Sequence, residues 1–112
     1  LNIGFTHILR TVMKTYPMKR VTIVCEALAR DPLRQVLKDV GAHGFTAFSV
    51  EGEGSQGLRP GDIAEFANIQ MEVVVQPSVA ETLLKRLEEE FFPRFAMIAY
   101  LSDIEVLRPQ KF

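Results

Sequence analysis

The chain has 112 residues, which is enough for one domain with a modest hydrophobic core. Its formal net charge of -1, with 24% charged residues, gives no electrostatic footprint for nucleic acid. A single cysteine excludes an intramolecular disulfide framework and a cysteine cluster for zinc, and every apolar run is too short for a membrane-spanning helix. We therefore expect a cytoplasmic domain with no metal and no nucleic-acid partner.

The first 17 residues differ from the rest of the chain because they contain no acidic residue and show no clear apolar period. A strong strand pattern opens at Met18, so we expect the domain to span 18–112. Residues 1–17 are then a tail outside it, from an artificial or upstream-start extension. The alternative is an amphipathic helix that docks on a partner or a membrane, its apolar side formed by Phe5, Ile8 and Val12.

The first half of the domain is predicted to form a strand, a helix and a second strand. Apolar residues alternate over 20–26, where Cys25 is expected to be a buried small side chain rather than a reactive thiol. Asp31 followed by proline predicts an N-cap and the first position of a helix, which Gly41 ends. The second strand is expected from about residue 45 to 51.

A glycine-rich loop follows, with four of the seven glycines between residues 51 and 62. Glycine lets a ligand approach the backbone closely, so Gly54 and Ser55 can form an anion-binding nest, to which Arg59 adds a positive charge. The alternative is a flexible hairpin tip with ordinary turn chemistry. Well-specified segments flank this loop, and an insertion of roughly 15 residues in a compact domain is more often functional.

The second half repeats the strand and helix pattern. Strict alternation predicts a strand over 68–76, and Ser78 with Glu81 predicts a capping box at the start of a helix that Pro93 closes. An apolar strand is expected over 95–101. The apolar phase then changes at Ser102, which predicts a bulge or a strand that joins another sheet.

In chain order these elements give the ferredoxin-like βαββαβ pattern of an α+β fold, with a four-stranded antiparallel sheet and the long loop between strands 2 and 3. This architecture serves many functions. An RNA-recognition module would have aromatic residues on the third strand, where this chain has Asn68, Gln70 and Glu72. An enzyme would need a general base, a nucleophile or a metal centre, and we find no such group in a recognisable catalytic setting.

The chain from Met18 to Lys111 resembles the PII-like signalling proteins. It is most similar to the SbtB and carboxysome-associated branch, found beside bicarbonate transporters and carboxysomes. The resemblance rests on motifs that are individually weak but together cover nearly the whole domain. They are 19–24 in the first strand, 40–46 in the turn, 52–56 at the start of the loop, and 98–100 with 105–107 at the end.

The resemblance implies a homotrimer that binds adenine nucleotides in clefts between subunits, while the loop, called the T-loop in this family, reports the bound ligand to a partner. The chain also departs from the founding PII proteins. Phe92–Ala96 replaces their glycine- and lysine-rich phosphate loop, Gln56 replaces an arginine, and the T-loop has no modifiable tyrosine. Control by uridylylation is therefore not expected.

We expect a non-enzymatic regulator that senses ADP or AMP, with bicarbonate as a candidate second ligand and a bicarbonate transporter or carboxysome-associated protein as a candidate partner. The alternatives are a small hydrolase of the acyl phosphatase or nucleotidase type, and a CutA-like structural trimer without a small ligand. The expected nucleotide-binding residues are Gly54, Ser55, Arg59, Arg94, Phe95, Arg108 and Lys111. The candidate bicarbonate residues are Gln56, Gly57 and Arg59.

Overall fold

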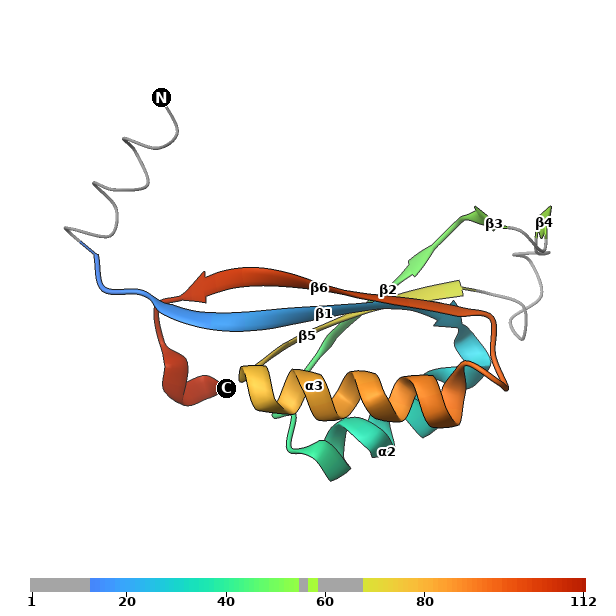
Figure 1. Ribbon diagram of the computed structural model, residues 1–112. Coiled ribbons are helices and arrows are strands. Elements are labelled where there is room, and N and C mark those ends of the chain that lie inside the picture. Colours follow the sequence, from blue (N-terminus) through green and yellow to red (C-terminus); the bar gives the residue numbers. More distant parts are fainter. Residues whose placement is uncertain (1–12, 55–56, 59–67) are drawn as a thin grey trace.

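The computed structural model of the chain describes residues 13–54, 57–58 and 68–112. In this part of the chain one sheet lies over two helices (Figure 1). Its strands stand in the order β2-β5-β1-β6, and every neighbouring pair is antiparallel. The α+β ferredoxin-like prediction is confirmed. The strands are β1 (Tyr16–Glu26), β2 (Thr46–Val50), β5 (Asn68–Val75) and β6 (Met97–Val106), and the helices are α2 (Arg30–Val40) and α3 (Pro77–Arg86).

The core forms between the helices and one face of the two central strands. Side chains alternate across a strand, so Val21 and Ile23 of β1 share a face with their partners Val73 and Met71 of β5. All four are fully buried. They pack with the apolar stripes of both helices, and each such side chain stabilises the fold by roughly 1.5–3 kcal/mol. The helical members are Leu33, Val36, Leu37, Ala80, Leu83, Leu87 and Phe91.

The first helix begins earlier than its sequence predicts. A short 3-10 helix, Ala27–Ala29, leads directly into α2, so Ala29 is the N-cap and the Asp31 side chain makes no capping hydrogen bond. The predicted cap at Asp31 is therefore wrong. The predicted end is confirmed, since Gly41 has a left-handed φ of 87°, which glycine adopts without steric cost. Ala42 N–H then donates to the carbonyl of Leu37 at 2.9 Å.

The predicted capping box of the second helix is also wrong. Pro77 is the first residue of α3 and Gln76 is its N-cap, because proline needs no N–H partner and has a preset φ at that position. Ser78 lies inside the helix, where its carbonyl accepts a hydrogen bond from Thr82 Oγ1 at 3.2 Å. The helix continues as a π-helix, Leu87–Phe91, whose end is followed by a turn into β6.

The last strand has no bulge, contrary to the sequence prediction. The register with β1 is continuous from Tyr16 opposite Val106 to Cys25 opposite Met97. Because the register is continuous, Ile104 and Val106 lie on the same face of β6 as Ile98 and Tyr100, so the change of apolar phase reflects which face is apolar and not a register shift. The pairing also starts β1 at Tyr16, two residues before the expected beginning of the domain.

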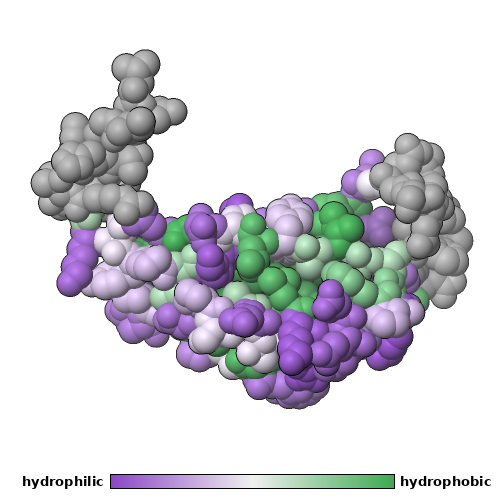
Figure 2. All heavy atoms as spheres, in the orientation of Figure 1, coloured by the Kyte–Doolittle hydropathy of each residue, from purple (hydrophilic) through white to green (hydrophobic). Residues whose placement is uncertain are grey.

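The sheet face opposite the helices carries exposed apolar side chains. Ile98 and Tyr100 of β6 and Phe48 of β2 lie on this face and are 60%, 48% and 45% exposed. We call it the open face. Figure 2 shows apolar surface along the middle of the view, at the level of the sheet, above a hydrophilic lower part formed by the helices. Among the described residues, the sheet therefore has one face buried by helices and one face without a covering layer.

Candidate functional site

The two ends of the sheet carry different residues and connect to different segments of the chain. At the loop end, Glu26, Val50 and Asn68 lie side by side, and β2 and β5 connect to the glycine-rich segment there. This segment contains two short strands, β3 (Glu53–Gly54) and β4 (Gly57–Leu58), which pair with each other and lie beyond the sheet (Figure 1). At the terminal end, Tyr16 pairs with Val106.

Four of the predicted site residues belong to the loop end. Gly54 of β3 pairs with Gly57 of β4, which places both glycines in the hairpin that projects from this end. Arg94 and Phe95 lie in the turn between the π-helix and β6, at the same end of the sheet. Three further predicted residues, Ser55, Gln56 and Arg59, lie outside the described residues. The predicted anion nest at Gly54 and Ser55 therefore stays a prediction.

The turn that carries Arg94 is held by aromatic packing. The buried Phe91 ring lies 5.8 Å from the Phe95 ring, centroid to centroid. The Arg94 guanidinium lies 5.0 Å from the centre of the Phe95 ring, within range of a cation–π contact. These contacts hold Arg94 in place in the turn. The residue is exposed, so its positive charge is accessible at the loop end of the sheet. An anion is the ligand that such a group attracts.

One carboxylate at the loop end was not predicted as part of the site. Glu26, the last residue of β1, accepts a hydrogen bond from Ala96 N–H at 2.9 Å. The two residues are 70 positions apart, so no local sequence pattern indicates the contact. Burial, and secondarily the Glu26 charge, raise the pKa of the neighbouring Cys25 thiol to about 11. Cys25 is therefore a buried thiol, as predicted, and not a thiolate nucleophile.

The remaining predicted residues lie at the terminal end. Arg108 follows β6, and Lys111 belongs to a short 3-10 helix, Pro109–Lys111, where its N–H donates to the Arg108 carbonyl at 3.2 Å. The ten residues of β6 separate them from Arg94, a span of about 30 Å at the usual rise of a strand. A single chain therefore does not bring the two groups of predicted cations together.

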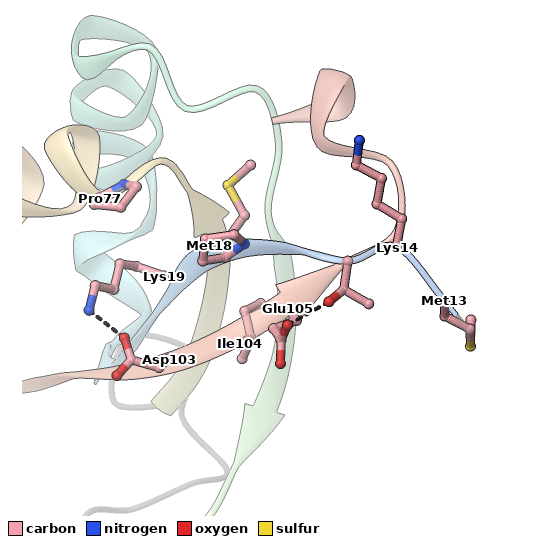
Figure 3. A pocket seen from close by; sticks show the side chains of 10 residues that line it. Met13, Lys14, Met18, Lys19, Pro77, Asp103, Ile104 and Glu105 are labelled. Carbon is pink, nitrogen blue, oxygen red and sulfur yellow. Dashed lines mark hydrogen bonds and ion pairs between the residues drawn. The ribbon is translucent and has the colours of Figure 1, made fainter. Parts of the chain in front are cut away.

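A cavity of about 730 Å³ lies at the terminal end, between the start of β1 and the end of β6 (Figure 3). Its charged side chains already have partners within the chain. Lys19 forms an ion pair with Asp103, Glu105 accepts a hydrogen bond from Thr15 at 2.5 Å, and Lys14 lies over the Tyr16 ring. None of the predicted ligand-binding residues that the structure describes lines this cavity. Its mixed, paired charges do not favour an anionic ligand, so we assign it no role in nucleotide binding.

Within the described ranges, no three His, Cys, Asp or Glu side chains gather in a way that could hold a metal ion. In the same ranges, no helix is both long enough and apolar enough to cross a membrane.

Comparison with known proteins decides the family. Residues 18–111 match the family described as nitrogen regulatory protein P-II. The chain belongs to the P-II family. A putative PII-like signaling protein from Thermus thermophilus is 43% identical, with 89% of this chain and 99% of that chain covered and a TM-score of 0.78. A comparison with curated proteins found no match.

A second P-II relative has been solved with ligands. CPII from Thiomonas intermedia, bound to ADP, AMP and bicarbonate, is 28% identical to this chain. The alignment covers 90% of this chain and 98% of CPII, with a TM-score of 0.83. The chain is thus a PII-like regulatory protein, as its sequence predicts. The finer assignment to the SbtB and carboxysome-associated branch stays a prediction.

Proposed function

We propose that this P-II protein senses ADP or AMP, takes bicarbonate as a second ligand, and signals in the inorganic-carbon metabolism of the cytoplasm. The observation that carries the proposal is its likeness to CPII, which has been solved with ADP, AMP and bicarbonate and covers 90% of this chain. The loop between β2 and β5 would report the bound ligand to a bicarbonate transporter or a carboxysome-associated protein.

The open face supports assembly into a homotrimer, which is typical of the family. Ile98 and Tyr100 expose apolar surface there, and a second copy of the chain would remove it from water. Arg20 also lies on this face. Its Nη2 donates to Ser102 Oγ at 3.3 Å, while its buried Nε has no hydrogen-bond partner among the described residues. A neighbouring copy could supply that acceptor as well as the apolar cover.

The two ends of the sheet would form one nucleotide site in such an assembly. Arg94 and Phe95 of one copy would lie at one side of a cleft, and Arg108 and Lys111 of the next copy at the other. Arginine binds phosphate oxygens in bidentate geometry, so cations from two subunits suit a nucleotide phosphate chain. This arrangement accounts for the separation of about 30 Å that β6 imposes within one chain.

Bicarbonate is proposed to bind beside the nucleotide, through backbone N–H groups of Gln56 and Gly57 and the Arg59 guanidinium. A planar anion of carbonate shape suits these donors. If the nucleotide phosphates order the Gly54 end of the loop, the second anion binds a preformed site. The two ligands would then favour each other by about 1–3 kcal/mol, and linkage makes the effect equal in both directions.

The proposal is tested by calorimetry with AMP and ADP. The titrations are done at fixed pH and ionic strength, with and without millimolar bicarbonate. We expect nucleotide binding that bicarbonate tightens, reciprocal tightening of bicarbonate binding, and weaker coupling in Arg59→Ala. Absence of nucleotide binding would overturn the sensor function. Unchanged nucleotide affinity across millimolar bicarbonate would overturn the coupling alone, and steady hydrolysis of ADP, ATP or an acyl phosphate would favour the hydrolase alternative.

A further inference from the structure

Residues 13–17 precede the part of the chain that matches the P-II family, but some of them form part of the sheet. The family match begins at Met18, whereas β1 begins at Tyr16. Tyr16 lies opposite Val106, and Pro17 lies opposite the residue before it. Val106 is the last residue of β6. Among the described residues, the last two residues of this strand are therefore paired by residues outside the family match.

Side-chain contacts add to this pairing. The Thr15 hydroxyl donates to the Glu105 carboxylate at 2.5 Å, a contact drawn as the dashed line at Glu105 in Figure 3. The Lys14 ammonium lies 5.5 Å from the centre of the Tyr16 ring, within range of a cation–π contact. Thr15 and Tyr16 are both half-buried. The segment is therefore joined to the end of β6 by a side chain as well as by strand pairing.

The two cations predicted at the terminal end follow directly after this pairing. Arg108 lies two positions after Val106 and leads into the 3-10 helix. Local hydrogen bonds close that helix: Lys111 N–H donates to the Arg108 carbonyl at 3.2 Å, and Phe112 N–H donates to the Pro109 carbonyl at 3.1 Å. Local bonds set the shape of the helix but not its place on the molecule. Its place depends on how firmly the end of β6 is held.

We propose that residues 15–17 clamp the end of β6 and so position Arg108 and Lys111 for an anionic ligand. The inference rests on the proposed nucleotide site, in which these two cations form the terminal half. Without residues 15–17 the register would end at Met18 opposite Ile104, and the rest of β6 would fray as an unpaired strand end does. Cations that are already in place bind a phosphate more tightly, because less conformational entropy is lost on binding. The segment acts through the two cations and does not need to touch the ligand.

Amide hydrogen exchange of residues 104–108, followed by mass spectrometry, tests the clamp. Thr15→Val removes the hydroxyl donor and nearly preserves the shape of the side chain. Tyr16→Gly weakens the strand itself, because glycine has no side chain to pack and gains backbone freedom. Thr82→Val is the matched control, since Thr82 Oγ1 also makes one exposed hydrogen bond, to the Ser78 carbonyl in α3.

We expect residues 104–108 to exchange about three- to tenfold faster in Thr15→Val, as the loss of one hydrogen bond predicts. Exchange should be faster still in Tyr16→Gly and unchanged in Thr82→Val. Wild-type exchange of this segment in Thr15→Val would overturn the clamp, whether or not Tyr16→Gly folds. This measurement needs no nucleotide, so it does not depend on the proposed function.

Calorimetry with ADP tests whether the clamp positions the cations. Thr15→Val should weaken ADP binding by about three- to fivefold, and Thr82→Val should leave it unchanged. In the Arg108→Ala background the loss caused by Thr15→Val should be clearly smaller, because residues that act through one another are not additive. An equal loss in both backgrounds, or no loss in the wild-type background, would overturn the positioning role. If the wild-type protein binds no ADP, the proposed function fails and the positioning role with it, whereas hydrogen exchange still decides whether the clamp exists.

Discussion

The two ends of the sheet are built from the same strands but carry different chemistry. At the loop end, Arg94 projects from a turn fixed by Phe91 and Phe95, and Glu26 accepts a hydrogen bond from Ala96 N–H at the end of that turn. At the terminal end, Arg108 and Lys111 follow β6 on a single 3-10 turn. No described contact joins these two groups of cations within the chain. Each end therefore holds half of a predicted anion site.

The difference between the ends follows from chain direction. β6 starts at the loop end and finishes at the terminal end, so residues just before it and just after it cannot meet in one copy. An open face with exposed Ile98 and Tyr100 lies between them. The proposed site, completed by a second copy, would account for both features with one assembly.

The largest effect is expected from Tyr100→Arg on the open face. A buried, unpaired cation at the proposed subunit interface is strongly unfavourable, so the proposed trimer should dissociate. Nucleotide affinity should fall by roughly 100-fold or more, because charge-assisted contacts from the second copy are lost. Light scattering and calorimetry on the same sample measure both effects. Leu28→Gln is a control that adds no charge, since Leu28 is 59% exposed and lies in the 3-10 helix before α2. Full nucleotide affinity in a stable monomer would contradict the divided site.

A mixing experiment with Arg94→Ala and Arg108→Ala gives the next largest effect. Each variant alone should weaken ADP binding by about 10- to 100-fold, because each removes a charge-assisted contact. After the two are unfolded together and refolded at equal amounts, about a quarter of the clefts should combine an intact Arg94 with an intact Arg108 from the next copy. Calorimetry should then show that fraction of tight sites. If none appears, the two arginines do not share a cleft between copies.

Asp103→Asn should have a small effect at the terminal end. Its ion pair with Lys19 is exposed, with 85% of the Asp103 side chain accessible, and such pairs contribute about 0–1 kcal/mol to stability. ADP affinity should stay within about twofold of wild type, since neither residue contacts a predicted ligand-binding group. Urea unfolding and calorimetry check this. A large loss of ADP affinity would mean that the cavity in Figure 3 takes part in binding.

The smallest effect is expected from Arg86→Gln in the helix layer, away from both ends. Arg86 binds Asp39 at 3.2 Å and Glu90 at 2.7 Å. Hydrogen bonds from Gln35 and then Arg86 lower the pKa of the Asp39 carboxyl, and a hydrogen bond from Arg86 lowers that of Glu90. Carboxyl groups with a lowered folded-state pKa stabilise the fold above their unfolded pKa of about 4 and lose that contribution as the pH falls further.

The wild-type protein should therefore have a slightly higher free energy of unfolding than Arg86→Gln at pH 7, and this difference should become smaller below about pH 4. Urea unfolding at both pH values measures it. A gap that does not change with pH would mean that Arg86 acts through packing of its side chain rather than through its charge. Nucleotide affinity should be unchanged in this variant, which makes it a control for changes at either end.

Sequence patterns alone predicted most of the fold because burial imposes a regular period on the chain. The alternation in β5 and the apolar stripe of α2 are both confirmed, and Gly41 marks the end of α2 since only a left-handed residue fits there. The errors fall where tertiary context overrides a local signal. The caps at Asp31 and Ser78 are displaced by a preceding 3-10 helix and by Pro77. β6 has no bulge because its pairing with β1 holds one continuous register along the whole strand.

The same division holds for the candidate site. Sequence alone could indicate which cations and glycines suit an anion, because charge and backbone freedom are properties of single residues. Only the tertiary structure placed Arg94 and Arg108 at opposite ends, since the direction and length of β6 decide that distance. It alone brought Glu26 to Ala96 across 70 positions of sequence. A hydrogen bond between remote segments leaves no periodic trace in a sequence, so it becomes visible only when the sheet assembles.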